Sequence, residues 1–347
     1  MSVPESRIPK AAIFGCAGPV LSAQERAFFA AQNPFGFILF ARNVQAPDQV
    51  RALVKALRES VGRNDAPVLI DQEGGRVARL KPPHWRAAPA AAKIAALADQ
   101  DIDAACEAVW LNARLIGGDL AALGIDVDCA PVCDVPVAGS HDVIGDRAYG
   151  TDPGRVATLA RAAALGFLDA GVLPVIKHIP GHGRARADSH LELPTVDTPR
   201  ADLETADFVP FRALADMPWA MTAHVLYTAL DRERPATTSP TIIRDIIRGQ
   251  IGFDGVLVSD DLSMKALGGS FAERTRAALA AGCDLALHCN GDMAEMEGVA
   301  AAAGPLSEPA RKRIARAASR RSSSLRGADP AKLLARFETL VATRLAS

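Results

Sequence analysis

Eight short apolar runs alternate with helical segments along this chain, and that alternation constrains its fold more than any other feature. Each run is bounded by Gly, Pro or polar residues, as is typical of a buried strand. The predicted strands are Ala11–Cys16, Gly36–Phe40, Val68–Asp71, Ile125–Cys129, Leu173–Lys177, Trp219–Ala223, Val256–Ser259 and Asp284–His288. Apolar residues three and four positions apart predict helices at Pro47–Ser60, Asp103–Leu123, Arg155–Ala170, Arg200–Ala215, Pro240–Gln250 and Ser270–Ala281.

Strands that alternate with helices run parallel and are joined by right-handed crossovers. Eight such units with near-continuous apolar strands predict an α/β fold, the closed (β/α)8 or TIM barrel, because a parallel sheet is covered on both faces. An open doubly wound sheet is the alternative. That fold usually carries a Gly-rich phosphate loop, and Gly15-Cys16-Ala17-Gly18 matches such a loop too loosely.

No linker interrupts the 347 residues, so we predict a single domain over residues 1–347. Its barrel core spans about residues 11–290. A C-terminal segment at about 305–347 contains two basic, Ala-rich helical stretches, which we expect to pack on the outside of the barrel.

The charge balance argues against several classes of partner. The 39 basic residues nearly cancel the 40 acidic ones, so no excess of positive charge indicates nucleic acid or an anionic membrane surface. No stretch reaches the roughly 20 apolar residues that span a bilayer. The first ten residues lack the apolar core of a signal peptide. We therefore expect a cytoplasmic monomer, with reduced thiols at Cys16, Cys106, Cys129, Cys133, Cys283 and Cys289.

Titratable residues gather at the carboxyl ends of the predicted strands, which is where barrel enzymes build their active sites. They are Asp71, Glu73 and Arg76 after the third strand, Lys177, His178 and His182 at the fifth, His224 after the sixth, Asp260 and Asp261 after the seventh, and His288 at the eighth.

The segment 177–194 is the densest of these groups. Asp188 and His190 are two positions apart, so their side chains share a side in an extended loop. The carboxylate could then orient the imidazole and raise its basicity, as in a hydrolase triad. A solvated loop with satisfied histidines is the alternative without a function.

A zinc site is a competing interpretation of the same segment, because His178, His182 and His190 with Asp188 could ligate the metal. Two features argue against it. The glycines on both sides of His182 are typical of backbone turns, and no H-E-x-x-H helix signature occurs. We expect no metal and no cofactor.

Asp260 and Asp261 directly follow an apolar strand. Neighbouring strand residues face opposite ways, so we expect only one of them to point into the barrel mouth. A helix N-cap is the structural alternative for the other.

Near the tight turn at Gly74-Gly75, Asp71 and Arg79 suit the binding of sugar hydroxyls or of a carboxylate, and Arg147 is a similar candidate. A purely structural ion pair fits these residues equally well.

Five segments together make the chain recognisable: Ile70-Asp71-Gln72-Glu73-Gly74-Gly75-Arg76-Val77, Lys177-His178-Ile179-Pro180-Gly181-His182-Gly183, Asp188-Ser189-His190, Met221-Thr222-Ala223-His224, and Phe253-Asp254-Gly255-Val256 leading to Ser259-Asp260-Asp261-Leu262-Ser263-Met264. In this order, between about Gly36 and His288, the chain resembles the N-acetyl-β-glucosaminidase branch of glycoside hydrolase family 3, in particular the single-domain bacterial enzymes of peptidoglycan recycling. One departure is Ile179, where the family more often has an aromatic residue.

The resemblance implies a retaining exo-glycosidase that removes terminal N-acetylglucosamine from (1,6-anhydro)muropeptides. It implies Asp260 as the nucleophile, His190 as the acid/base, and Asp188 as the residue that orients His190 on a mobile loop. It also implies that the sugar is held by Asp71, Arg79, Arg147, Lys177 and His178. Three alternatives stay open: a phosphorylase on the same scaffold, a metal-dependent hydrolase, and a catalytically inactive muropeptide-binding protein.

Overall fold

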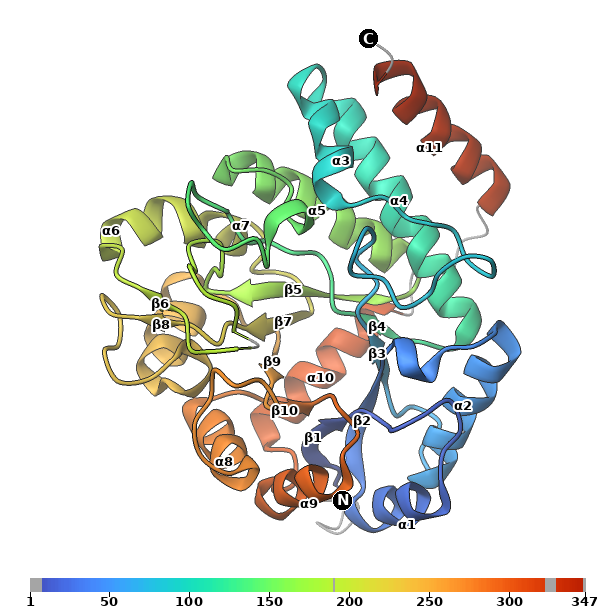
Figure 1. Ribbon diagram of the computed structural model, residues 1–347, viewed down its shortest axis with the longest axis vertical. Coiled ribbons are helices and arrows are strands. Elements are labelled where there is room, and N and C mark those ends of the chain that lie inside the picture. The colour runs from blue at the N-terminus through green and yellow to red at the C-terminus, as the bar shows by residue number, and fades with distance from the viewer. Residues whose placement is uncertain (1–7, 190, 322–328, 346–347) are drawn as a thin grey trace.

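The computed structural model describes residues 8–189, 191–321 and 329–345 (Figure 1). Eight parallel strands form a closed barrel in the order β1-β10-β9-β7-β5-β4-β3-β2, which confirms the predicted TIM barrel. Each predicted strand overlaps one barrel strand: β1 Lys10–Phe14, β2 Pro34–Leu39, β3 Val68–Ile70, β4 Val127–Asp128, β5 Leu173–Ile179, β7 Trp219–Thr222, β9 Val256–Asp261 and β10 Leu285–His288.

The strands are buried on both faces, which explains their unbroken apolar character. Every residue of β2 and of β5 is buried, because side chains fill the barrel on one side and helices cover the other. The register aligns the carboxyl ends of neighbouring strands: Lys177 of β5 pairs with Met221 of β7, and Met221 pairs in turn with Val258 of β9. Residues just beyond these pairs therefore meet at one end of the barrel.

The six predicted helical segments are found, with shifted ends in five of them. The outer layer consists of α1 Ala23–Gln32, α2 Pro47–Ser60, α3 Ala91–Ala95, α4 Ile102–Leu123, α5 Pro153–Asp169, α6 Arg200–Asp202, the π-helical turns η5 Leu203–Asp207 and η7 Ile242–Gln250, α7 Phe208–Ala213, α8 Phe271–Ala281 and α9 Met293–Ala302. Helix α2 matches its predicted range because Pro47 starts it and its buried residues, Val50, Leu53, Val54 and Leu57, share one face.

Helices α1 and α9 were not predicted from the sequence, although both begin with a residue that caps the helix N-terminus. The Ser22 side chain caps α1 in a capping box with Glu25, and Asp292 caps α9. Each helix has only ten residues, which leaves a short window for periodicity. A two-stranded parallel sheet was also not predicted. It pairs β6 Thr195–Val196 with β8 Leu226–Tyr227 and so ties the chain after residue 190 to the chain after β7.

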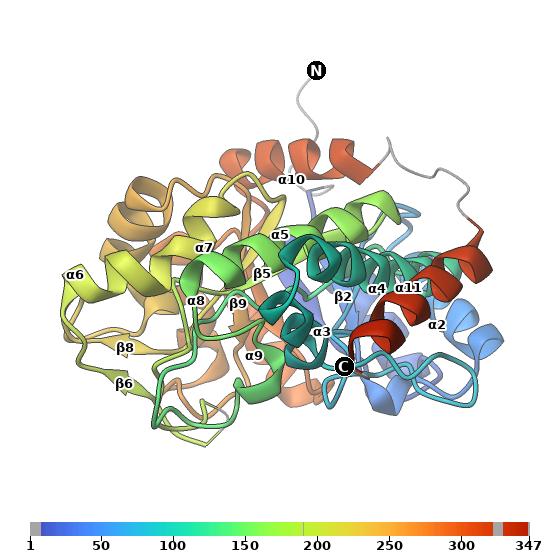
Figure 2. The same cartoon turned by 90° about the horizontal axis from the view of Figure 1, so that it is seen from above.

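The two C-terminal helices take different places. Helix α11, Pro330–Leu345, packs outside the barrel beside α4, where Arg336 forms a two-pronged ion pair with Glu107 at 2.7 Å (Figure 1). Helix α10, Glu308–Arg321, instead lies across the N-terminal end of the barrel, along one edge of the molecule in Figure 2. Its arginines hold it there, because they reach acidic residues that precede the barrel strands.

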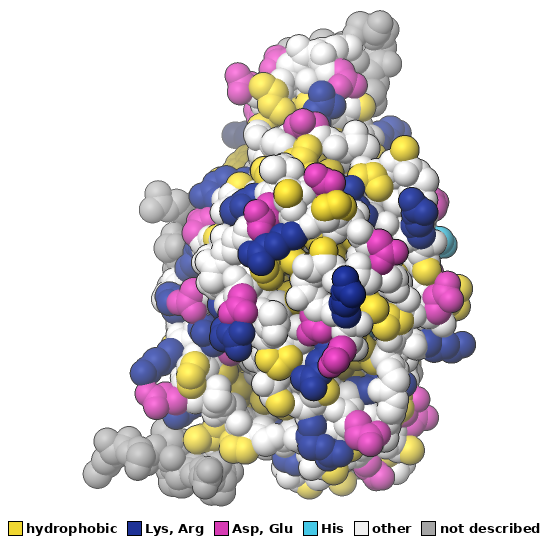
Figure 3. Space-filling model, turned by 90° about the vertical axis from the view of Figure 1, so that its left-hand side faces the viewer, with side chains coloured by type: hydrophobic (Ala, Val, Ile, Leu, Met, Phe, Trp, Pro, Cys, Tyr) yellow, Lys and Arg dark blue, Asp and Glu magenta, His cyan; other side chains and the backbone are white. Residues whose placement is uncertain are grey.

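The face of the molecule in Figure 3 carries Lys and Arg side chains interspersed with Asp and Glu. This mixture agrees with the near-zero net charge. Within the described ranges, no helix is long and apolar enough to cross a membrane.

Candidate active site

A cavity of about 340 Å³ opens at the carboxyl ends of the barrel strands. Of the eight residues singled out from the sequence, seven line it: Asp71, Arg79, Arg147, Lys177, His178, Asp188 and Asp260. The eighth, His190, lies outside the described residues. Segments separated by almost 190 positions in the chain thus supply a single site.

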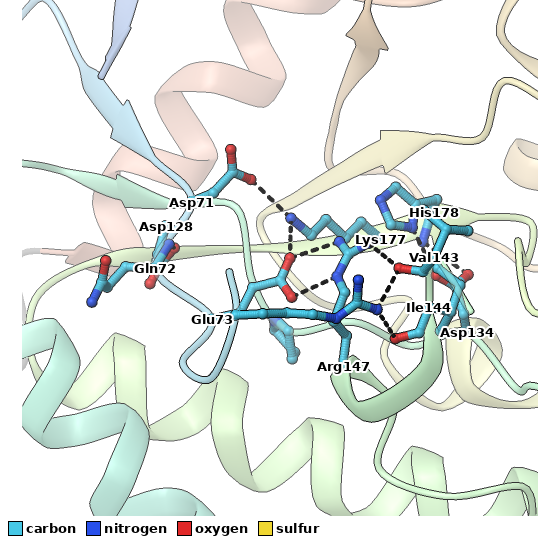
Figure 4. Close-up of polar contacts among 12 residues, drawn as sticks. Asp71, Gln72, Glu73, Asp128, Asp134, Val143, Ile144, Arg147, Lys177 and His178 are labelled. Atoms are coloured by element: carbon cyan, nitrogen blue, oxygen red, sulfur yellow. Dashed lines mark hydrogen bonds and ion pairs between the residues drawn. The ribbon is translucent and has the colours of Figure 1, made fainter. Parts of the chain in front are cut away.

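Lys177 is the centre of a buried ion cluster on one wall of the cavity. Its Nζ lies 2.9 Å from Asp71 Oδ1 and 2.7 Å from Glu73 Oε1, between the two carboxylates in Figure 4. Arg79 donates to the other oxygen of Asp71 at 3.1 Å. Arg147 forms two bonds of 2.8 Å with Glu73. Two acids and three cations thereby hold one another in fixed positions.

The charges in this cluster are mutually stabilised. Burial alone would raise the pKa of Asp71, but Lys177 and Arg79 outweigh it and hold that pKa well below its ordinary value. For Glu73, burial is likewise outweighed by Lys177 and Arg147, and its pKa falls to about 2. Burial would lower the pKa of Lys177, but the two carboxylates raise it above its usual value. These shifts favour the charged forms of Asp71, Glu73 and Lys177, and the cluster members that line the cavity present fixed donors and acceptors to a polar ligand.

His178 is oriented from behind by Asp134. Its Nδ1 lies 2.7 Å from Asp134 Oδ2, and Asp134 Oδ1 accepts bonds from the backbone N–H groups of His178 and His182 at 3.1 and 2.6 Å. Burial would raise the pKa of Asp134, but the two histidines lower it to about 2. Because the carboxylate can only accept, His178 donates through Nδ1, and Nε2 remains as its second nitrogen in the cavity wall.

Asp260 is the penultimate residue of β9, has 7% of its surface exposed and lines the cavity. Its Oδ1 accepts a 2.8 Å bond from the backbone N–H of Asp261. Burial would raise its pKa, but His224, His178, the hydrogen bond from the Asp261 N–H and the charge of Lys177 together outweigh burial, and the pKa is lowered. A lowered pKa favours the ionised form of this carboxylate in the cavity.

Both neighbouring aspartates line the cavity, although we expected only one of them to point into the barrel mouth. The Asp261 carboxylate accepts from the N–H groups of Ser263 and Cys289 at 2.9 and 3.1 Å, and from the Ser263 hydroxyl at 2.5 Å. Asp261 thus connects the turn after β9 to the residue that follows β10. This resembles the capping role weighed for it, although a turn and not a helix follows directly.

Asp188 lines the cavity from the segment that precedes His190. The adjacent Ser189 is anchored, because its carbonyl accepts from the Ala266 N–H at 3.2 Å and its hydroxyl lies 3.4 Å from His182 Nε2. Burial, followed by the neighbouring His178, lowers the pKa of His182 to about 4. A neutral imidazole therefore lines this side of the cavity at neutral pH.

Two further functional candidates were given no role from the sequence: Glu73, which was named only among the residues at the strand ends, and Asp134, which was not named. Glu73 stands inside a recognised motif directly after β3, and that position was an available signal. Asp134 follows an apolar stretch, and only the fold places it against His178, 44 positions away. Among the described residues, no group of three or more His, Cys, Asp and Glu side chains could hold a metal ion.

The sequence pattern of the Glycosyl hydrolase family 3 N terminal domain matches residues 18–322. This chain belongs to glycosyl hydrolase family 3. It is 43% identical over 282 residues to a "Beta-hexosaminidase" of Alkalilimnicola ehrlichii, a match that covers 80% of each chain. It is also 43% identical to a "Beta-hexosaminidase" of Methylococcus capsulatus, with 80% of this chain and 82% of the relative covered.

Among solved structures, this family 3 chain is similar to NagZ from Neisseria gonorrhoeae in complex with N-trifluoroacetyl-D-glucosamine. The TM-score is 0.86 at 31% identity, over 96% of this chain and 98% of the other. A family 3 beta-N-acetylglucosaminidase from Paenibacillus gives a TM-score of 0.85 at 31% identity, over 98% of this chain and 69% of that one. The chain is therefore a glycoside hydrolase, and the cavity at the carboxyl ends of its strands is its candidate active site.

Proposed function

We propose that this glycoside hydrolase is a retaining exo-β-N-acetylglucosaminidase. The observation that carries the proposal is the buried Asp260 carboxylate, which lines the same cavity as Asp71, Arg79, Arg147 and Lys177 of the ion cluster. The names of its relatives, and the N-acylated glucosamine bound to the Neisseria structure, support an N-acetylhexosamine as the sugar.

In the first step, Asp260 attacks the anomeric carbon and forms a covalent glycosyl-enzyme through an oxocarbenium-like transition state. Oδ1 of Asp260 is held by the Asp261 N–H. Oδ2 has no hydrogen bond to a described residue, so we assign it the attack. A lowered pKa keeps the carboxylate in the reactive form.

The buried ion cluster would bind the sugar hydroxyls and the N-acetyl group. Asp71 accepts hydrogen bonds, whereas Arg79, Lys177 and Arg147 donate them, and each already has a partner that fixes its direction. His178, oriented by Asp134, completes this set.

His190 would protonate the leaving oxygen and later deprotonate the attacking water, with overall retention. An imidazole is a weaker acid than a carboxylic acid, so Asp188 would stabilise its protonated form. Asp188 lines the same cavity as Asp260, which supports this pairing.

The biological substrates we propose are N-acetylglucosaminyl-(1,6-anhydro)muropeptides of cell-wall recycling. We further propose that the chain acts in the cytoplasm as a monomeric single-domain enzyme without a cofactor. The even balance of 39 basic and 40 acidic residues supports a small-molecule substrate over nucleic acid or an anionic membrane surface.

The first experiment is product analysis with 4-nitrophenyl N-acetyl-β-glucosaminide, with and without phosphate and with a chelator. Free N-acetylglucosamine under all conditions is the expected result. A sugar phosphate formed only with phosphate would replace hydrolysis by phosphorolysis, and inactivation by the chelator would indicate a metal-dependent hydrolase. No turnover would favour a binding protein.

The proposed pairing of Asp188 with His190 has its own test. Asp188→Asn should leave KM nearly unchanged and lower kcat by about 10³-fold or more, since an orienting carboxylate in a triad contributes on the order of 10⁴. An almost unchanged kcat would contradict the assignment of Asp188 and His190 as acid/base pair.

A further inference from the structure

Behind Asp260 lies a chain of buried polar side chains that the sugar-binding set does not include. Thr222 is the last residue of β7, His224 follows it, and Thr237 belongs to the short 3-10 turn η6, Ala236–Thr238. All three side chains are completely buried. Buried hydroxyls and imidazoles are costly unless they are hydrogen-bonded, so their partners indicate what they do.

His224 has a hydrogen bond at each ring nitrogen. Nε2 lies 3.0 Å from the backbone carbonyl oxygen of Asp261, and Nδ1 lies 2.7 Å from the Thr237 hydroxyl. A carbonyl can only accept, so Nε2 carries the proton. Burial is the largest influence on this imidazole, and it lowers the pKa despite the opposing charge of Asp260. In the neutral ring Nδ1 is an acceptor, and Thr237 donates to it.

The single proton of the Thr237 hydroxyl then sets the direction of the remaining bonds. Thr237 accepts from the Thr222 hydroxyl at 2.8 Å, and Thr222 accepts from the backbone N–H of Asp260 at 3.4 Å. Thr237 Oγ1 also lies 3.1 Å from the Ala223 carbonyl. It would donate there only if His224 were protonated and itself donated through Nδ1.

The chain of hydrogen bonds therefore starts on the backbone of Asp260 and ends on the backbone of the next residue, Asp261. It runs from the N–H of Asp260 through Thr222, Thr237 and His224 to the carbonyl of Asp261. Between these two ends, the Asp261 N–H binds the Asp260 carboxylate itself. Any shift of the Asp260–Asp261 peptide would change the direction in which that carboxylate points.

We propose that Thr237 and His224 are positioning residues for the nucleophile: through both ends of the Asp260–Asp261 segment, they hold the Asp260 carboxylate at the angle of attack. The role rests on the proposed function, because it requires Asp260 to be the nucleophile. Displacing a reacting group by about 1 Å can cost on the order of 10²-fold in rate.

The test compares Thr237→Val, which removes the hydroxyl with little change in shape, with Thr237→Ser, which keeps it. Thr275→Val is the matched control. Thr275 is also completely buried, but its hydroxyl bonds to the Phe271 carbonyl within α8 at 2.7 Å. Steady-state kinetics with 4-nitrophenyl N-acetyl-β-glucosaminide should show kcat reduced about 10- to 100-fold in Thr237→Val, with KM within about twofold. Thr237→Ser should recover most of the lost kcat, and Thr275→Val should keep it.

His224→Gln and His224→Leu provide a second pair, for the case that Thr237→Val does not fold. A Gln side chain can still donate to the Asp261 carbonyl, so His224→Gln should keep a higher kcat than His224→Leu. Equal kcat values in this pair would contradict the positioning role.

The failure of this inference can be told from the failure of the proposed function. If the wild-type protein turns the substrate over and Asp260→Ala does not, but Thr237→Val matches Thr275→Val in kcat, only the positioning role is wrong. A loss confined to KM, or a loss that Thr237→Ser does not recover, also overturns it. A wild-type protein that does not hydrolyse the substrate contradicts the proposed function and the inference with it.

Discussion

The two ends of the barrel use the same chemistry for different purposes. At the N-terminal end, Arg313 and Arg316 of α10 bind acids that precede β9 and β10, and together with the helix they cover the strands. At the C-terminal end, Asp71, Arg79, Arg147 and Lys177 line a cavity of about 340 Å³, and Glu73 holds Arg147 and Lys177 in place. Ion pairs that are covered by a helix fasten the fold, whereas ion pairs at a cavity wall hold polar groups ready for a ligand.

Two aspartates of strand β4 and its N-terminal flank, only two positions apart, differ in the same way in their partners. Asp126, just before the strand, is paired with Arg58 at 2.6 Å and with Arg321 of α10. Asp128, the last residue of the strand, accepts only from the Gln72 N–H at 2.9 Å, and its Oδ2 has no hydrogen-bond partner among the described residues. Burial is the main reason that the pKa of Asp128 rises to about 8.

The largest expected effect is the difference in kcat/KM between a variant at the C-terminal end of the barrel and a variant at the N-terminal end. Asp260→Ala should lower kcat/KM on the order of 10⁴-fold or more, since Asp260 is the proposed nucleophile and its loss would remove the covalent route. Asp254→Asn, at the N-terminal end, should leave kcat/KM within about twofold because Asp254 contacts arginines of α10 and not the cavity. Comparable losses in the two variants would erase the distinction between the ends.

Glu73→Gln should weaken both activity and stability. It deprives Lys177 and Arg147 of a buried carboxylate, so the free energy of unfolding should fall by about 3 kcal/mol, and kcat/KM should fall about 10²-fold. Glu107→Gln is the matched control, because Glu107 forms the same two-pronged pair with Arg336 at an exposed position. Its loss should be below about 1 kcal/mol in urea unfolding. Equal losses of unfolding free energy in Glu73→Gln and Glu107→Gln would mean that the buried ion pairs contribute no more to stability than the exposed one.

Arg313→Ala should affect stability alone. Arg313 binds Asp254 and the buried Asp284, and Asp284 keeps Arg248 as a second partner at 3.0 Å. We expect the free energy of unfolding to fall by about 1–2 kcal/mol with an unchanged kcat. Lys312→Ala, at an exposed pair on the same helix, should change unfolding by less than about 0.5 kcal/mol. A reduced kcat in Arg313→Ala would show that α10 influences the catalytic end.

The smallest effect concerns the pH dependence of stability. Asp128 has a pKa of about 8 in the folded protein and an ordinary value of 3.8, so between these pH values the folded state holds a proton that the unfolded chain releases. Its contribution to stability is therefore present at low pH and is lost as the pH rises toward 8, by up to about 1.4 kcal/mol per pH unit.

Asp128→Asn should accordingly flatten the fall in unfolding free energy between pH 6 and 7, measured in urea against the wild type. The difference between the two proteins is the informative quantity, because burial also lowers the pKa of His182 to about 4 and raises that of Asp207 to about 6. Parallel pH curves for wild type and variant would contradict a protonated Asp128.

The barrel could be predicted from sequence because its signal is local. Apolar runs of four to six residues, separated by amphipathic segments, are recognised from neighbouring residues alone, and all eight runs correspond to barrel strands. The cavity residues could be predicted for a related reason. Parallel strands place their carboxyl ends together, so polar residues at those ends meet, as seven of the eight named residues do.

What the sequence by itself determined is therefore the barrel, the end at which the site lies, and the acids and bases that line it, because each depends on patterns within short segments. Only the tertiary structure decided which partners these groups have. Lys177 lies between Asp71 and Glu73, and Asp134 orients His178. Thr237 reaches Asp260 through Thr222. Except for the bond between Thr222 and Thr237, these contacts join residues 38 to 106 positions apart. The place of α10 was decided in the same way, because its arginines find their carboxylates only once the strands have closed. Pairings of this kind depend on distances in space and on burial, and neither is written in the local sequence.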